Sequence, residues 1–214
     1  MSVKFPTTII NNFLDDPMGV RKFALTLPYK EGPNYPGVRS DLLKNISPSF
    51  DHEVVNRFLK VFYNLKGKKH SWNCDVVFQR INKGNATRGW IHRDPGTVTC
   101  VLYLNPEENK ESGTIIYEPK NPVLLDPFKN RNTKHLSVEE REPFRKEHQE
   151  QFEETVILKN KFNRLIAFDG QMYHSANDLI RSDSEGDKLT MVMFLYDFMI
   201  EGENVPLVRM KNFG

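Results

Sequence analysis

The chain of 214 residues carries 30 basic and 28 acidic residues, a net charge of +2, so its overall charge gives no support for nucleic-acid binding. Its length suffices for one domain with a sizeable hydrophobic core. No apolar run approaches the roughly 20 residues that cross a bilayer, and the N-terminal segment lacks the pattern of a secretory signal. We therefore expect one cytoplasmic domain over residues 1–214, with no nucleic-acid or membrane partner.

The first part of the chain, residues 1–70, predicts a short strand followed by two helices. The β-branched segment "TTIINNFL" is typical of a strand. A first helix is expected after Asp16 as N-cap, with Pro17 at its first position. A second amphipathic helix is expected to begin after the cap Ser47 and to end at Gly67.

From Trp72 onward the hydrophobic period changes from helical to two, which predicts strands. We expect six of them, at residues 71–82, 97–105, 113–119, 154–160, 163–170 and 188–199. Helices followed by many short strands indicate an α+β, mainly β fold whose strands close into a sandwich or barrel. The two cysteines, Cys74 and Cys100, lie in apolar strand-like segments, which favours buried free thiols over a disulfide.

A highly charged insertion at about residues 120–155 separates the two groups of strands. Ser137 and Glu140 form the sequence pattern of a capping box, which predicts a helix there. Pro143 argues against one unbroken helix. The insertion is either a solvated surface element or a cover over the mouth of a site, and the sequence leaves both readings open.

Two metal-capable side chains, His92 and Asp94, stand directly before the predicted strand at 97–105, and His174 follows the one at 163–170. Side chains at i and i+2 project to the same side of a strand, so we expect His92 and Asp94 to face inward together. Two histidines and one carboxylate form the facial triad that binds Fe(II). The triplet alone is a weak signal, because Asp94 could cap the following Pro-Gly turn and His92 could be an exposed loop histidine.

The residues around the triplet resemble the Fe(II)/2-oxoglutarate-dependent dioxygenases, and most of all their prolyl-4-hydroxylase-like branch. The resemblance is carried by "HRDPGTVTCVLYLN", "SGTIIYEP", "NRLIAFDG", "YHSAN" and "KLTMVMFLYDF", and it covers about residues 75–198. It implies a double-stranded β-helix, a jelly-roll or cupin-like barrel, at residues 71–200 with supporting N-terminal helices. It also implies Fe(II), the cosubstrates 2-oxoglutarate and O2, and ascorbate as a supporting reductant.

The resemblance also implies roles for individual side chains. The three iron ligands it implies are His92, Asp94 and His174. Tyr103 would hydrogen-bond the distal carboxylate of 2-oxoglutarate, and Lys188 would form a salt bridge to the same carboxylate. Arg181 is a rival for that salt bridge, because the loop before Lys188 is longer than is usual in the family. Asn82 stands where close relatives often have a tyrosine, which puts the details of the pocket wall in doubt.

The implied reaction is hydroxylation of a C–H bond with release of succinate and CO2. Halogenating relatives lack the carboxylate ligand, so the presence of Asp94 favours hydroxylation. The alternative is a non-catalytic, cupin-like barrel that binds a metal or ligand. The sequence does not define the oligomeric state or the substrate, which could be a prolyl residue, another peptidyl group or a small molecule. Tyr35 and Arg39, in a loop before the strands, are either substrate contacts or parts of a packed turn.

Overall fold

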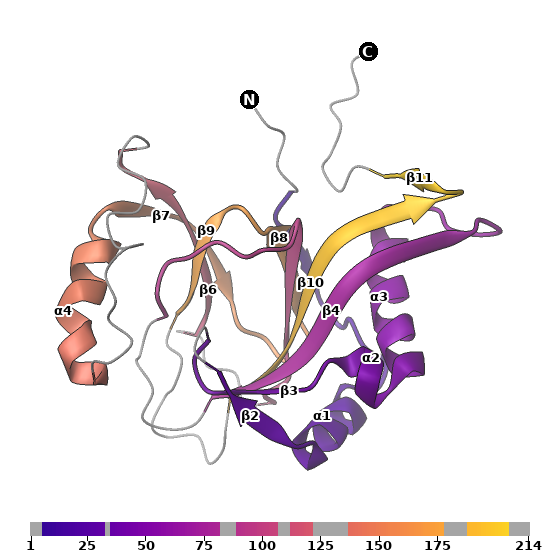
Figure 1. The fold of residues 1–214 in the computed structure, drawn as a ribbon, viewed down its shortest axis with the longest axis horizontal. Coiled ribbons are helices and arrows are strands. Elements are labelled where there is room, and N and C mark those ends of the chain that lie inside the picture. Colours follow the sequence, from indigo (N-terminus) through magenta and orange to yellow (C-terminus); the bar gives the residue numbers. More distant parts are fainter. Residues whose placement is uncertain are drawn as a thin grey trace.

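The computed structural model describes residues 6–32, 35–81, 89–106, 112–121, 137–177 and 188–205. These residues form two antiparallel sheets with helices on their outer sides (Figure 1). The helices are α1 (Pro17–Thr26), α2 (Leu43–Ile46), α3 (Pro48–Phe62) and α4 (Val138–Gln149). The strands are β1 (Thr8–Ile10), β2 (Tyr29–Glu31), β3 (Val38–Ser40), β4 (His70–Ile81), β5 (Val98–Tyr103), β6 (Gly113–Pro119), β7 (Phe152–Lys159), β8 (Leu165–Asp169), β9 (Tyr173–Asn177), β10 (Lys188–Ile200) and β11 (Glu203–Asn204).

The large sheet has the strand order β1-β8-β5-β10-β4-β3-β2, with β11 paired to β10, and the small sheet has the order β7-β6-β9. The expected mainly β architecture with supporting N-terminal helices is confirmed, and each of the six predicted strands is present. The sequence did not predict β2, β3, β9 or β11. These strands are short, and they form because of pairing with neighbouring strands more than because of their own hydrophobic pattern.

One side of the large sheet, which we call its outer face, packs against α1 and α3 (Figure 1). Side chains of β5 and β10 that are almost fully buried there include Cys100, Leu102, Met191 and Met193. Each large apolar side chain buried in this way contributes about 1.5–3 kcal/mol. Cys74 lies in the same core, and both cysteines are buried free thiols, as predicted.

Both helices begin at the predicted residues, but the second lacks the predicted side-chain cap and ends earlier than predicted. The Asp16 carboxylate accepts a hydrogen bond of 2.8 Å from the backbone N–H of Gly19. Ser47 makes no side-chain capping bond to α3, because it also ends α2, where its N–H donates to the Leu43 carbonyl. Helix α3 ends at Phe62 rather than at Gly67. None of the helices among the described residues is long and apolar enough to span a bilayer.

The described part of the insertion consists mainly of α4. The predicted capping box is present, since Ser137 and Glu140 each bind the other's backbone N–H. The predicted break at Pro143 is wrong, because the helix continues through it. Pro143 stands in the middle of α4 and removes only one backbone hydrogen bond, while the capping box holds the first turn. The two ends of the insertion are joined by a hydrogen bond of 2.9 Å from the Lys120 N–H to the Gln151 carbonyl.

The other side of the large sheet, its inner face, is turned toward the small sheet. We define the inner face by the side chains that alternate with the outer core on β4, β5 and β10: Gln79, Thr99, Val101, Tyr103, Lys188, Thr190, Val192 and Phe194. Tyr103, on β5, contacts Thr114, on β6, through a hydrogen bond of 3.0 Å between their hydroxyls. It also packs with Ile116 and Leu158 of the small sheet. The inner face therefore combines polar side chains with a small apolar cluster.

Candidate metal centre

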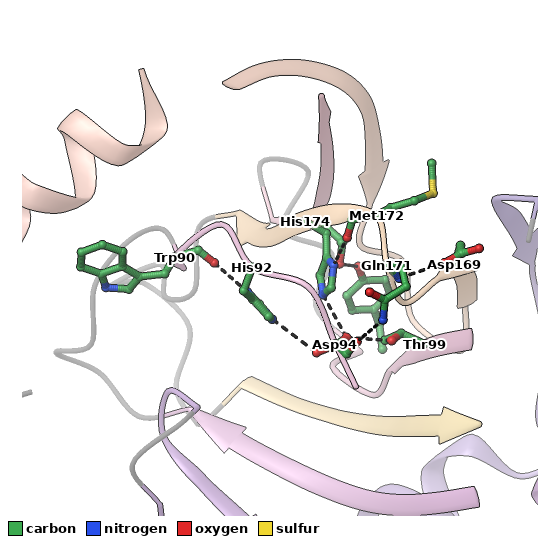
Figure 2. Close-up of polar contacts among 10 residues, drawn as sticks. Trp90, His92, Asp94, Thr99, Asp169, Gln171, Met172 and His174 are labelled. Atoms are coloured by element: carbon green, nitrogen blue, oxygen red, sulfur yellow. Dashed lines mark hydrogen bonds and ion pairs between the residues drawn. The ribbon is translucent and has the colours of Figure 1, made fainter. Parts of the chain in front are cut away.

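Three potential metal ligands converge at the edge of the inner face. His174 Nε2 lies 3.0 Å from Asp94 Oδ2, and His92 Nε2 lies 3.6 Å from Asp94 Oδ1. Figure 2 shows both imidazole rings pointing toward the Asp94 carboxylate. No other group of three or more such ligands is found among the described residues. The structure thus brings together the three side chains that the sequence pattern singled out.

The two histidines are placed by a short antiparallel contact between their backbones. His92 N–H donates to the His174 carbonyl at 3.0 Å, and His174 N–H donates to the His92 carbonyl at 2.9 Å. His174 belongs to β9, whereas His92 forms only this isolated bridge. The side chains of His92 and Asp94 face each other as expected, but no regular strand holds the two residues. The backbone bridge to His174 positions His92, and a loop positions Asp94.

The loop that carries Asp94 is held by contacts to both backbone and side chain. Asp94 N–H donates to the Gly170 carbonyl at 2.8 Å, and Gln171 Nε2 donates to the Asp94 carbonyl at 2.9 Å. Thr99 Oγ1 donates to Asp94 Oδ2 at 2.7 Å and so orients the carboxylate from β5. A Cβ added to Gly170 would lie 2.1 Å from the Gly96 carbonyl oxygen, so only glycine fits this close approach.

Both histidines are oriented through their second ring nitrogen. Nδ1 of His92 lies 2.7 Å from the Trp90 carbonyl, and Nδ1 of His174 lies 2.9 Å from the Met172 carbonyl. A carbonyl only accepts, so each Nδ1 carries the proton and each Nε2 is left with a lone pair in the neutral ring. His70 makes the same contact to the carbonyl two residues before it, but its Nε2 faces an asparagine oxygen. His92 and His174 therefore differ from His70 in that their Nε2 atoms face a carboxylate.

The site is electrostatically prepared for a cation. Burial raises the pKa of the Asp94 carboxyl, but the hydrogen bonds and positive charges of His174 and His92 outweigh it, and the net pKa is well below the ordinary value. Burial lowers the pKa of His92, but its hydrogen bond and attraction to Asp94 raise it by more. The side chains of His174 and Asp94 are 7% and 11% exposed, whereas that of His92 is 52% exposed. The centre therefore opens to solvent beside His92.

The donor set and its spacing fit a divalent first-row metal. Two ligand atoms at about 2.1 Å from one ion and at right angles to each other lie about 3 Å apart. The separations of 3.0 and 3.6 Å between the histidine nitrogens and the carboxylate are close to that value. Two imidazoles and one carboxylate on one side of an ion leave its other positions open, as in the facial triad of non-heme iron sites. The residues present therefore fit Fe(II).

The predicted cosubstrate residues both lie on the inner face. Tyr103 is Cα partner to Thr190 across β5 and β10, and Lys188 stands two residues before Thr190 on the same side. Lys188 Nζ donates to Ser112 Oγ at 2.7 Å. Thr99, whose hydroxyl binds the Asp94 carboxylate, lies four residues before Tyr103 on β5, at the other end of the strand. Arg181 and Asn82 lie outside the described residues.

Several polar residues around the site were missed by the sequence analysis. They are Gln79, Thr99, Ser112, Thr114, Gln171 and Thr190. Only Thr99 and Thr190 had a signal that could have found them, because each shares its strand phase with Tyr103 or Lys188. The others come from different strands and loops, and only the register of the sheets brings them to the site.

The family model described as "Family of unknown function (DUF6445)" matches residues 2–195. The chain belongs to this family. No curated protein sequence gave a significant match. The family assignment itself therefore supplies no reaction or substrate.

Solved structures supply a likeness of fold. SnoN, the non-heme α-ketoglutarate-dependent epimerase from nogalamycin biosynthesis, is 10% identical with a TM-score of 0.55, over 97% of this chain and 86% of SnoN. HygX from Streptomyces hygroscopicus, solved with nickel, 2-oxoglutarate and hygromycin B, is 12% identical with a TM-score of 0.53, over 87% of this chain and 81% of HygX. AviO1 from Streptomyces viridochromogenes Tue57 is 9% identical with a TM-score of 0.53, over 97% of this chain and 93% of AviO1. At these identities the likeness shows a shared fold and does not select a branch.

Proposed function

We propose that this chain is an Fe(II)- and 2-oxoglutarate-dependent oxygenase built on a double-stranded β-helix. The observation that carries the proposal is the convergence of His92, Asp94 and His174 at one end of the inner face. The fold likeness supports the cosubstrate, because SnoN depends on α-ketoglutarate and the HygX structure contains 2-oxoglutarate. Both the donor set and the fold therefore favour the same chemistry.

In the proposed reaction, His92, Asp94 and His174 would hold Fe(II). The bound iron would supply oxidation of a C–H bond, in which substrate, 2-oxoglutarate and O2 give hydroxylated substrate, succinate and CO2. Thr99 and Gln171 keep the Asp94 side chain and backbone in place during turnover. Phe168, whose ring centroid lies 4.7 Å from that of His174, excludes water on the buried side. Ascorbate would support activity by keeping the iron reduced.

Tyr103 and Lys188 would bind the distal carboxylate of 2-oxoglutarate. Burial raises the pKa of the Tyr103 phenol, so the hydroxyl keeps its proton and can donate. Lys188 would exchange its hydrogen bond with Ser112 for a salt bridge or make both. The register supports this assignment, because a diacid chelated near Asp94 would extend along β5 from Thr99 toward these two groups.

The fate of the C–H bond is the finer part of the proposal. The carboxylate ligand Asp94 and the resemblance to prolyl hydroxylases favour hydroxylation of a peptidyl prolyl group or a small molecule. Because SnoN, which has a similar fold, is an epimerase, inversion of a C–H centre is the alternative reaction that an experiment should distinguish from hydroxylation. Hydroxylation adds the mass of one oxygen atom to the product, whereas epimerisation leaves the mass unchanged.

The proposed function is tested by cosubstrate binding and turnover. Anaerobic addition of Fe(II) and 2-oxoglutarate should produce a visible charge-transfer band, and admission of O2 with ascorbate should yield succinate and CO2. His174→Gln should remove both signals. His70→Gln is the matched control, because His70 has the same Nδ1 contact but faces no carboxylate, and it should retain both.

Two outcomes would contradict the proposal in different ways. Binding of Fe(II) and 2-oxoglutarate without any succinate, including slow turnover in the absence of substrate, would indicate a non-catalytic metal-binding protein of the cupin kind. Absence of the charge-transfer band altogether would contradict the assignment of the metal and cosubstrate site.

A further inference from the structure

Arg39 places a positive charge on the inner face that the proposed iron and cosubstrate chemistry does not use. It lies on β3, where its Cα partner on β4 is Gln79. Its guanidinium carbon lies 4.1 Å from the centre of the Tyr35 ring and 5.4 Å from that of the Phe194 ring. The side chain therefore points to the same side of the sheet as Phe194, between two aromatic walls.

The guanidinium is held in one orientation by a single hydrogen bond. Arg39 Nε donates to Gln79 Oε1 at 3.0 Å, and Gln79 Nε2 in turn donates to the Pro36 carbonyl at 3.0 Å. The Gln79 carboxamide is thus fixed from both ends, and it fixes the plane of the guanidinium. Across the described ranges of the chain, no hydrogen bond is found from the two terminal nitrogens of Arg39, which form the fork that pairs with an oxyanion.

The fork of Arg39 is close to the metal centre. Phe194, under the guanidinium, is Cα partner to Thr99 on β5, and Thr99 binds Asp94 at 2.7 Å. Burial lowers the pKa of Arg39, and attraction to Asp94 is among the smaller effects that oppose it. A group seated on the fork would therefore lie on the inner face near Phe194, within electrostatic reach of Asp94.

The formal charges of the proposed complex leave Arg39 without a counterion. Asp94, Fe(II), the 2-oxoglutarate dianion and Lys188 sum to zero. The nearby Asp75 carboxylate is already paired with Lys44 at 2.8 Å. Once the metal and cosubstrate are bound, Arg39 contributes an excess positive charge in a half-buried site, where a missing partner is costly.

We infer that Arg39 binds a carboxylate or phosphate group of the substrate that is oxidised, so that the substrate belongs to the class of organic anions. The inference rests on the proposed function and extends it to the substrate. The two nitrogens of the fork match the oxygens of either oxyanion. Tyr35 and Phe194 would flank the carbon skeleton next to that group.

The test measures anion binding in the presence of cosubstrate but without turnover. Protein loaded with Ni(II) and saturating 2-oxoglutarate is titrated calorimetrically with benzoate and phenyl phosphate, and with their neutral analogues benzamide and phenol. At least one anion should bind at least about 10-fold more tightly than its neutral analogue, the effect of one charge-assisted pair. The stronger anion then identifies carboxylate or phosphate as the preferred group.

Arg39→Met should abolish this preference while changing the Kd of 2-oxoglutarate by less than about 2-fold. Arg80→Met is the matched control: it follows Gln79 on β4, projects to the other side of the sheet and stacks over Tyr29 at 5.0 Å. It should leave both affinities unchanged.

Three results would overturn the inference. They are no preference for either anion, an equal loss in Arg80→Met, and a loss of 2-oxoglutarate affinity in Arg39→Met as large as that in Lys188→Met. The last would make Arg39 a cosubstrate ligand. Failure of the wild-type protein to bind Ni(II) and 2-oxoglutarate would instead contradict the proposed function.

Discussion

The two faces of β10 differ in composition although they share one backbone. Leu189, Met191, Met193 and Leu195 point outward and are at most 2% exposed in the core shared with α1 and α3. The alternate residues on the inner face include Lys188, which donates to Ser112, and Thr190, which lies opposite Tyr103 of β5. The outer face supplies stability, and the inner face carries the groups of the proposed reaction. Substitutions on the two faces should therefore separate stability from activity.

The largest effect is expected on the inner side, for Asp94→Ala. Loss of the carboxylate removes one metal ligand and leaves the two Nε2 atoms without their partner. We expect 2-oxoglutarate-dependent succinate formation to fall by more than about 100-fold, since even changes behind a metal ligand cost up to that much. Thermal unfolding should show a folded protein. A variant with near-normal turnover would remove Asp94 from the metal centre.

The counterpart on the outer face is Leu102→Ala, one residue from Tyr103 on β5. Leu102 is 1% exposed, so the change should lower the free energy of unfolding by about 2–5 kcal/mol. The folded fraction should bind 2-oxoglutarate with normal affinity, as measured by titration at low temperature. Tyr103→Phe should lower the free energy of unfolding only slightly but should weaken the binding of 2-oxoglutarate. Equal effects on both properties in both variants would contradict the separation of the two faces.

Lys188→Met tests the end of the inner face that lies away from the metal. Removal of one charge-assisted hydrogen bond should raise the Kd of 2-oxoglutarate by about 10- to 100-fold. The affinity for the metal alone should not change, because Lys188 contacts Ser112 rather than a metal ligand. Calorimetric titration of both ligands checks this. An unchanged Kd for 2-oxoglutarate would direct attention to Arg181.

Thr99→Val tests the support behind the metal ligand at nearly constant volume. The change removes the donor to Asp94 Oδ2, so the carboxylate loses one of the contacts that orient it. We expect metal affinity to fall by about 10-fold, with little change in the Kd of 2-oxoglutarate at saturating metal. Thr97→Val is the control, since the Thr97 hydroxyl donates to the Tyr196 carbonyl and, among the described residues, contacts none of the three candidate metal ligands.

The smallest effect concerns a second buried carboxylate, Asp51 of α3. Burial raises its pKa, and one of its oxygens has no hydrogen-bond partner in the described part of the chain. A carboxyl whose pKa is raised by folding stabilises the fold fully below its unfolded pKa of about 3.9 and loses that contribution as the pH rises through the folded value. The stability of Asp51→Asn relative to wild type should therefore increase from pH 4 to pH 7, by about 1 kcal/mol or less.

Urea unfolding at several pH values measures this trend. Asp94→Asn in the metal-free protein should give the opposite slope, in the range below about pH 4. Its pKa is lowered, so wild-type Asp94 stabilises the fold above the unfolded pKa and loses that contribution only as the pH falls through the lower folded value. The same residue type thus has opposite effects in the two regions because one carboxylate has cationic partners. Parallel slopes would contradict this.

Local patterns were sufficient to predict the strands other than β2, β3, β9 and β11, and to single out the three candidate metal ligands that the structure brings together. His92 and Asp94 are close in sequence, and the role of Tyr103 is implied by the family resemblance. Arg39 and Gln79 could not be paired from the sequence, since their contact depends on which strand neighbours β4. The course of the chain through Pro143 was also not predictable, because it depends on how the rest of α4 compensates for one missing bond.

The position of the sulfur atoms has a further consequence. Cys74, Cys100, Met191 and Met193 all lie on the outer face, and burial raises the pKa of both thiols, which keeps them protonated. In an enzyme of the proposed class, oxidants that escape the iron would meet the inner face first. The thickness of the sheet therefore shields these four side chains from oxidative self-damage. Met172, whose own backbone carbonyl orients His174, lacks this shield and is the methionine in which we expect sulfoxide to accumulate during uncoupled turnover.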